Sequence, residues 1–292
     1  METARCKAFL YAAETGTITQ AADKLAYTPS GVSQLIQALE NELGVQLLFR
    51  NKRGVTLTEE GALFLPVVRE FLRQEDAIYQ LSSEVHGLAV GSVTIATYSS
   101  IAAHWLPQVI HRFQEDYPNI RIQLIEGYRQ EVESLLAEKK ADLAFMSYKE
   151  PMPYEWIPLA EDPLLAILNR SHPCAGNSSY PLTNLGSEKA VIIPAQGFDA
   201  DTRPLLEEYG LSRDLSFKTG ETPPAIAMVE QDIGICIINK LITDKLDFDV
   251  IKMPVDPPQS ITLGIAMNSL KSASPAVRKF VDVAVKMLSK PE

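Results

Sequence analysis

Residues 17–43 contain two short helical patterns joined by a tight turn, and this segment limits the fold of the chain more strongly than any other. Thr17 is suited to cap the first helix, and Thr28 is suited to cap the second. Pro29 follows at the first helical position, where its missing N–H costs nothing. The first helix repeats small and aliphatic residues on one face, which permits close packing against the second. The segment therefore predicts a helix-turn-helix.

The second helix of this pair has one apolar face and one uncharged polar face. Its apolar stripe consists of Val32, Leu35, Ile36, Leu39 and Leu43, and its polar stripe consists of Ser30, Ser33, Gln34 and Gln37. Glutamine can form two hydrogen bonds with adenine in the major groove, and serine can bond to several bases. We predict that the polar stripe, preceded by Thr28 and Pro29, contacts DNA. The alternative is an ordinary solvated helix face.

A short basic hairpin follows the two helices. Residues 47–50 and 55–57 have the pattern of short strands, and the turn between them ends in Gly54. Arg50 and Arg53 would lie beside DNA phosphates, which cationic side chains attract irrespective of base sequence. The whole chain nevertheless carries 27 Lys plus Arg against 37 Asp plus Glu, a formal net charge of -10. Any DNA affinity must therefore come from local geometry.

Several residues at fixed spacing make this segment more specific than a bare helix-turn-helix pattern. They are Ala21 and Ala22, Ser33 and Gln34, Leu39 and Glu40, Leu43, Gly44 and Val45, Phe49 and Arg50, and Leu57 and Thr58. At these positions the chain closely resembles the N-terminal winged helix-turn-helix of LysR-type transcriptional regulators, and a looser resemblance runs the length of the chain. The family often has arginine where this chain has Gln34, so the contact there favours adenine over guanine.

The resemblance implies a cytoplasmic regulator of transcription that has no enzymatic activity and no cofactor. Such proteins bind double-stranded promoter DNA as homodimers or homotetramers, respond to a small-molecule effector and act on RNA polymerase. We assign as DNA contacts Thr28, Pro29, Ser30, Ser33, Gln34, Gln37, Arg50 and Arg53.

The fold that the resemblance implies is α/β, with three parts along the chain. They are an α-rich winged helix-turn-helix (residues 1–58), a long linker helix for dimerisation with a hinge (59–91), and an effector-binding domain (92–292). The effector-binding domain is expected to be two-lobed and similar to periplasmic binding proteins, with lobe I formed by 92–161 and 268–292 and lobe II by 162–267. The effector would bind between the lobes.

The linker helix is predicted from its cap and its apolar spacing. Thr58 is a suitable N-cap, and helical sequence continues to about His86, a length on the order of 40 Å. An imperfect coiled-coil seam is formed by Phe64, Val68, Phe71, Ile78 and Val85. Pro66 should kink or loosen the first turns. We expect this helix to dimerise the protein; the alternative is packing within the chain.

From Ser92 onward, strand patterns alternate with helical patterns, which is typical of α/β organisation. The predicted strands are 93–96, 121–125, 142–146 and 164–168, and the predicted helices include 106–113 and 131–137. Ser99 and Ser100 follow the first strand, and Thr222 is a candidate cap for a later helix. Helix starts present unpaired N–H groups, so these places are candidates for binding a carboxylate or another small anion. Plain helix capping is the alternative for each residue.

The family resemblance adds five further candidates for the effector site. They are Tyr128, Met146, Ser147, Gln196 and Phe198, which join Ser99, Ser100 and Thr222. Some relatives carry a cation near the position of Met146, which is apolar here, so a strongly acidic effector is disfavoured unless Arg129 or Arg203 compensates.

Other classes of protein fit the sequence less well. The four histidines lack metal-ligand spacing, and the chain has no GxSxG, phosphate-loop or HExxH motif, so we assign no catalytic residue and no metal. Cys6, Cys174 and Cys236 lack CxxC spacing; Cys236 lies in an apolar run and is expected to be core rather than redox-active. A transport receptor would share the two-lobed fold, but the absence of a signal peptide and of a membrane-length apolar run favours a cytosolic protein.

Overall fold

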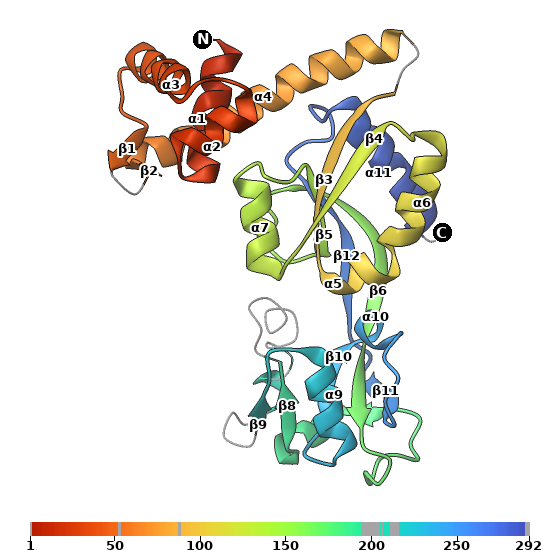
Figure 1. Ribbon diagram of the computed structural model, residues 1–292. Helices are drawn as coiled ribbons and strands as arrows, with labels where there is room; N and C mark the ends of the chain where they lie inside the picture. The colour runs from red at the N-terminus through yellow and green to blue at the C-terminus, as the bar shows by residue number, and fades with distance from the viewer. Residues whose placement is uncertain are drawn as a thin grey trace. The chain divides into compact units, whose positions relative to one another are not determined.

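The computed structural model describes residues 2–51, 54–86, 89–193, 205, 207–210 and 216–289 (Figure 1). The chain divides into two compact units. The first consists of residues 1–91 with the short segments 137–140 and 273–276, and the second contains the rest.

The N-terminal unit is built from four helices and a hairpin. In order they are α1 (Thr3–Thr15), α2 (Ile18–Leu25), α3 (Pro29–Leu43), β1 (Leu48–Asn51), β2 (Gly54–Leu57) and α4 (Glu59–Val85). Both predicted caps are present, because the Thr17 hydroxyl accepts from the Gln20 N–H at 3.2 Å and the Thr28 hydroxyl accepts from the Gly31 N–H at 3.1 Å. The helix-turn-helix prediction is confirmed. The sequence analysis did not assign α1, which supplies a further layer of the core.

The core of this unit contains the apolar stripe of α3. Val32, Ile36 and Leu39 are fully buried, and Leu35 and Leu43 pack partly buried against them. Their burial is the main source of stability here, since an aliphatic side chain removed from water contributes about 1.5–3 kcal/mol. The opposite side of α3 is consequently exposed to solvent. The helix therefore has one apolar face and one polar face, as the sequence predicts.

The hairpin is a two-stranded antiparallel pair in which Arg50 lies opposite Val55. Gly54 has a φ of 135°, and a Cβ at this position would lie 2.2 Å from the Gly16 carbonyl oxygen. The Val55 N–H donates to that same oxygen at 2.8 Å. The absence of a side chain at Gly54 thus allows the hairpin to dock on the turn between α1 and α2. Residues 52 and 53, which include the predicted contact Arg53, lie outside the described residues.

Helix α4 has 27 residues and begins at the Thr58 cap, whose hydroxyl accepts from the Gly61 N–H at 2.8 Å. Its N-terminal half packs on the helix-turn-helix core through Phe64, Val68 and Phe71. Packing within the chain is therefore confirmed for three members of the predicted seam. The C-terminal half extends beyond the three-helix core (Figure 1) and leaves Ile78 66% exposed and Val85 85% exposed. Leu81, at 47% exposure, also leaves much of its side chain open to solvent on this half.

The second unit is organised around one eight-stranded sheet that passes through two lobes. Its strand order is β4-β3-β5-β12-β6-β11-β7, and β10 pairs separately with β6. Lobe I contains β3 (Gly91–Thr97), α5 (Ser99–His104), α6 (Leu106–Asp116), β4 (Ile120–Glu126), α7 (Arg129–Ala137), β5 (Leu143–Ser147) and α11 (Pro275–Leu288). Lobe II contains β7 (Tyr180–Pro181), the 3-10 helix η1 (Leu182–Ser187), β8 (Ala190–Ile192), β9 (Ser216–Lys218), α9 (Thr222–Glu230), β10 (Cys236–Asn239), α10 (Lys240–Thr243) and β11 (Ile251–Asp256).

Two long strands join the lobes, as Figure 1 shows: β6 (Glu155–Leu168) and β12 (Ser260–Met267). The first part of β6 pairs with β12, and its last residues pair with β10 and β11. The sequence analysis predicted only 164–168 of this strand. Pro158 and Pro163 explain the difference, because a residue without an N–H is usually found at a strand edge or an irregularity. Pro158 lies opposite Gly264, where the register of the pair shifts.

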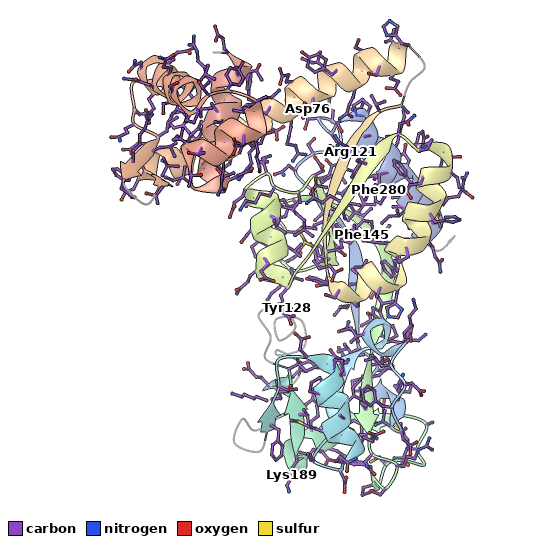
Figure 2. All side chains as sticks on the ribbon, viewed as in Figure 1. Asp76, Arg121, Tyr128, Phe145, Lys189 and Phe280 are labelled. Atoms are coloured by element: carbon purple, nitrogen blue, oxygen red, sulfur yellow. The ribbon has the colours of Figure 1, made fainter. Side chains whose placement is uncertain are left out.

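The other predicted strands and helices of this unit correspond to β3, β4, β5, α6 and α7. Each lobe has its own core. Phe113, Phe145 and Phe280 are fully buried in lobe I, and Phe280 contacts both other rings edge-on. Figure 2 labels Phe145 and Phe280 in this core. Of the helices that the structure describes, none combines the length and the apolar character needed to cross a bilayer.

Candidate functional site

The polar stripe of α3 forms an exposed, uncharged surface. Thr28, Pro29, Ser30, Gln34 and Gln37 are exposed and Ser33 is half-buried. The Thr28 and Ser30 hydroxyl oxygens lie 3.1 Å apart, so they can share a hydrogen bond at the start of the helix. Glutamine and serine side chains on such a face can donate to and accept from base edges, which lone cationic side chains cannot do.

The hairpin lies close to the C-terminal half of α3. The Glu40 carboxylate accepts from the Leu47 and Leu48 N–H groups at 2.8 and 3.1 Å. The Arg50 guanidinium lies 3.9 Å from the same carboxylate and is exposed. Glu40 therefore ties the hairpin to α3 while leaving Arg50 available to solvent. An exposed guanidinium beside a two-faced helix is suited to a phosphate contact.

A cavity of about 530 Å³ lies between the two lobes of the second unit. Four of the predicted effector residues line it: Ser99, Ser100, Tyr128 and Thr222. Met146 and Ser147 are fully buried in lobe I and are not part of the cavity wall. Gln196 and Phe198 lie outside the described residues. The cavity is large enough for a small organic molecule.

Two side chains, Tyr128 and Lys245, form hydrogen bonds across the cavity from one lobe to the other. Figure 2 shows Tyr128 at the edge of lobe I that faces lobe II, and its hydroxyl donates to the Glu221 carboxylate at 3.2 Å and to the Gly220 carbonyl at 3.4 Å. The Lys245 ammonium donates to the Ala103 carbonyl at 3.0 Å. Burial, followed by the nearby Glu221 charge, raises the pKa of Tyr128, so the hydroxyl remains a donor. These bonds favour the arrangement of lobes seen here.

Ser147 has a structural role in lobe I. Its carbonyl accepts from the Arg129 guanidinium at 2.9 Å, and its hydroxyl lies within hydrogen-bonding distance of both Arg129 and the Tyr98 hydroxyl. The other end of that guanidinium donates to Glu133 at 3.1 Å. Arg129, considered from the sequence as a partner for an acidic effector, is therefore engaged by lobe I itself. Met146 packs in the apolar core beside α7.

The sequence analysis missed two buried polar residues on the cavity wall, Asp162 and Asn239, which are 6% and 3% exposed. One Asp162 carboxylate oxygen accepts from the Leu241 N–H at 3.0 Å. Burial raises the pKa of Asp162 to about 6, although the Leu241 N–H and the nearby Asn239 amide counteract it. The Asn239 amide nitrogen makes no well-formed hydrogen bond to any described residue. The alternation along β6 could have identified Asp162, because it shares a face with Leu164, but the two prolines obscured that strand.

Helix α9 begins differently from the prediction. The N-cap is Glu221 rather than Thr222, which is the first helical residue, because Glu221 has the extended backbone that a cap requires. Pro223 and Pro224 then occupy the first turn, so two of its N–H donors are missing. The start of α9 is consequently a weak anion site.

The architecture defines a class of protein: a helix-turn-helix DNA-binding module and a two-lobed ligand-binding module on one chain. The sequence model of the LysR substrate binding domain matches residues 86–289, and that of the bacterial regulatory helix-turn-helix protein, LysR family, matches residues 4–62. The chain therefore belongs to the LysR family of bacterial DNA-binding transcriptional regulators, which are not enzymes.

Individual relatives agree with this assignment. The chain is 29% identical to the uncharacterized HTH-type transcriptional regulator YvbU of Bacillus subtilis, over 97% of this chain and 98% of YvbU. The structure of full-length OxyR C199D from Pseudomonas aeruginosa has a TM-score of 0.78 and 16% identity, covers 100% of this chain and 99% of its own, and supports the fold. Full-length BenM, a regulator of Acinetobacter baylyi, has a TM-score of 0.61 and 25% identity, with 98% of this chain and 96% of BenM covered.

Proposed function

We propose that this protein binds promoter DNA as a homo-oligomer and that a small molecule in the interlobe cavity controls the arrangement of its DNA-binding heads. The observation that carries the DNA half of this proposal is the exposed polar stripe of α3. In that stripe Gln34 and Gln37 would read bases, with Thr28, Pro29, Ser30 and Ser33 beside them, and Arg50 and Arg53 would bind phosphates. Since the DNA of a bacterium lies in the cytoplasm, we place the protein there.

The proposed oligomer rests on the apolar face of α4. Val67, Ile78, Leu81 and Val85 are exposed, and they follow the three- and four-residue steps of a heptad seam with Gln74 between them. We propose that two copies of the chain pair through this face. Exposed aliphatic residues on one side of a long helix are removed from water when they pack against the same face of a second copy. Two such dimers would then form the tetramer.

The cavity supports the effector half of the proposal. A ligand that contacts both lobes favours the arrangement in which both contacts are made, and it shifts the population toward that arrangement. We propose that residues 1–58 bind DNA, 59–91 dimerise the protein and 92–292 sense the effector, so that a change of lobe angle alters the spacing of the heads. Altered spacing would change DNA bending and contact with RNA polymerase.

The experiment that tests this function is fluorescence anisotropy of the full chain on DNA from upstream of its own gene and on a scrambled duplex of equal length. We expect tighter binding to the first duplex, and an affinity that falls with added salt because phosphate contacts release counterions. Equal affinity for both duplexes over the whole salt series, and equally for a pool of random genomic fragments, would contradict the proposal.

A further inference from the structure

The charge of the interlobe cavity favours a different class of ligand from the small anion expected from its serines and threonine. Four carboxylates contribute to the wall: Glu126, Glu131, Asp162 and Glu221. Among the residues that the structure describes, the permanently charged cations on the wall are Arg129 and Lys245. His104 adds little positive charge, because burial and then the neighbouring Lys245 lower its pKa. Counted over the part of the wall that the structure describes, the cavity is therefore net negative at neutral pH.

The cations of the wall are also poorly placed to bind an anion. Arg129 is 4% exposed and already bonds to Ser147 and Glu133, and Lys245 donates to the Ala103 carbonyl. At the start of α7, the Tyr128 N–H already donates to the Glu131 carboxylate at 2.8 Å. An entering carboxylate would have to compete with these acceptors and would meet like charges, which disfavour it.

The buried end of the cavity supplies the positive evidence. Asp162 is an ionisable acceptor with one oxygen bonded to the Leu241 N–H, so its other oxygen can accept from a ligand. Asn239 is 3% exposed; its amide nitrogen makes no well-formed hydrogen bond among the described residues, and it lies near enough to Asp162 to lower the pKa of that carboxyl. An amide nitrogen has two N–H donors, so a ligand oxygen beside the ligand's own donor can accept from the N–H that does not face Asp162.

Part of the remaining wall is aliphatic and is formed by Ile193, Ile242, Leu246, Ile261 and Leu263. It can bury the apolar body of a ligand while the polar end contacts Asp162 and Asn239.

We propose that the cavity binds a small molecule that carries a protonated amine next to a hydroxyl or carbonyl oxygen, with the amine against Asp162, the oxygen against Asn239 and an apolar body against the aliphatic wall. This inference rests on the proposed effector function of the cavity and names the chemical class of the effector.

The test compares probes that share one apolar body and differ in charge: cyclohexylmethylamine, cyclohexylmethanol and cyclohexanecarboxylate, together with 2-amino-2-cyclohexylethanol. Their dissociation constants are measured by ligand-observed NMR with the full chain. We expect the two amines to bind more tightly than the carboxylate by about tenfold or more, since a charge-assisted hydrogen bond is replaced by repulsion. The amino alcohol should bind most tightly.

Variants locate the binding and control for charge. Asp162→Asn should weaken the amines about tenfold and leave cyclohexylmethanol unchanged. Glu221→Gln should also weaken binding of the amines. Because Glu221 is an exposed residue of the cavity wall, this variant should fold even if a substitution at the buried Asp162 is not tolerated. The matched control is Glu161→Gln. Glu161 is the neighbour of Asp162 on β6, but its carboxylate accepts from the Ser260 and Thr262 hydroxyls and is not part of the cavity wall, so the variant removes the same charge outside the cavity. It should have no effect.

Two outcomes overturn the inference in different ways. A carboxylate that binds at least as tightly as the amines, and is displaced by no amine, would make the ligand class wrong while the cavity remained a ligand site. Binding of no probe would overturn both the ligand class and the proposed effector function of the cavity. If both Asp162→Asn and Glu221→Gln bound the amines as tightly as wild type, the amines would bind at a site other than this cavity.

Discussion

At the scale of single residues, Asp162 is a carboxyl on the cavity wall whose burial opposes the stability of the fold at neutral pH. Its carboxyl is 6% exposed, and its nearest charged neighbours are Asp244 and Lys240, which act in opposite directions on its pKa. Burial dominates and raises that pKa to about 6. A carboxyl kept in such a place, where an apolar residue would be more stable, fits a role in binding.

Asp162→Asn should therefore change how stability depends on pH. Because the folded pKa lies above the unfolded value, the folded state binds more protons between about pH 4 and pH 6, and wild-type stability falls as pH rises through that window. The variant lacks this loss. We therefore compare the free energy of unfolding of the variant with that of wild type at each pH. The difference, variant minus wild type, should be about 2–3 kcal/mol more positive at pH 7 than at pH 4.

Urea unfolding of ligand-free protein at several pH values measures this difference. The control is Glu161→Gln, whose exposed carboxylate should produce no comparable gain. A relative stability of Asp162→Asn that does not change with pH would show that the carboxyl is not desolvated as described.

The polar stripe of α3 allows a second prediction at this scale. Gln34→Ala should lose discrimination at one base position of the site, by roughly 1–3 kcal/mol. Arg50→Ala should instead weaken specific and scrambled duplexes alike, because a phosphate contact carries no sequence information. Anisotropy on single-base variants of the bound duplex separates the two effects. Gln123→Ala, at an exposed glutamine on β4, is the control, and a uniform loss in Gln34→Ala would remove its base-reading role.

At the scale of elements, α4 has two halves with different partners. Phe64, Val68 and Phe71 are used by the helix-turn-helix core, which fixes the first half of the helix on the DNA-binding unit. Ile78, Leu81 and Val85 are exposed on the second half. A heptad pattern alone does not distinguish these uses, since both require apolar residues at three- and four-residue spacing.

Ile78→Glu should dissociate the proposed dimer. Two copies of the new carboxylate would face each other across the seam, and we expect dimerisation to weaken by about 3 kcal/mol or more. Sedimentation equilibrium over a range of protein concentrations measures this change. Ser83→Glu adds the same charge on the opposite side of α4 and should leave assembly unchanged. An unaltered oligomeric state in Ile78→Glu would place the interface elsewhere.

At the scale of the whole molecule, control of DNA binding requires that the effector unit have more than one accessible arrangement of its lobes. The lobes are joined by β6 and β12, and the Tyr128 and Lys245 hydrogen bonds span the cavity between them. Such bonds are individually modest, so a ligand that contacts both lobes can outweigh them.

Tyr128→Phe should impair the response to ligand without affecting basal DNA binding. The variant loses the bonds to Glu221 and Gly220, so more ligand is needed to favour the same arrangement, and we expect the half-maximal concentration of the tightest-binding amine to rise by roughly threefold to tenfold. The readout is the length of the DNase footprint as a function of ligand. Tyr148→Phe, whose hydroxyl bonds only locally to Glu150, is the matched control. A footprint that no ligand alters in wild-type protein would contradict coupling between the units.

The sequence by itself determined the helix-turn-helix, the hairpin, the long helix and the alternating strands and helices of the second unit, because caps, turns and apolar periodicity are local properties. The sequence patterns at Ser99, Ser100 and Thr222, and the family resemblance at Tyr128, selected four residues that all line one cavity; their role in binding an effector stays a prediction. Only the tertiary structure decided that Met146 and Ser147 are internal, that the first half of α4 is already packed, and that Asp162 and Asn239 meet at the cavity. Those outcomes depend on contacts between residues far apart in the chain, and periodicity along one element carries no information about what lies opposite it.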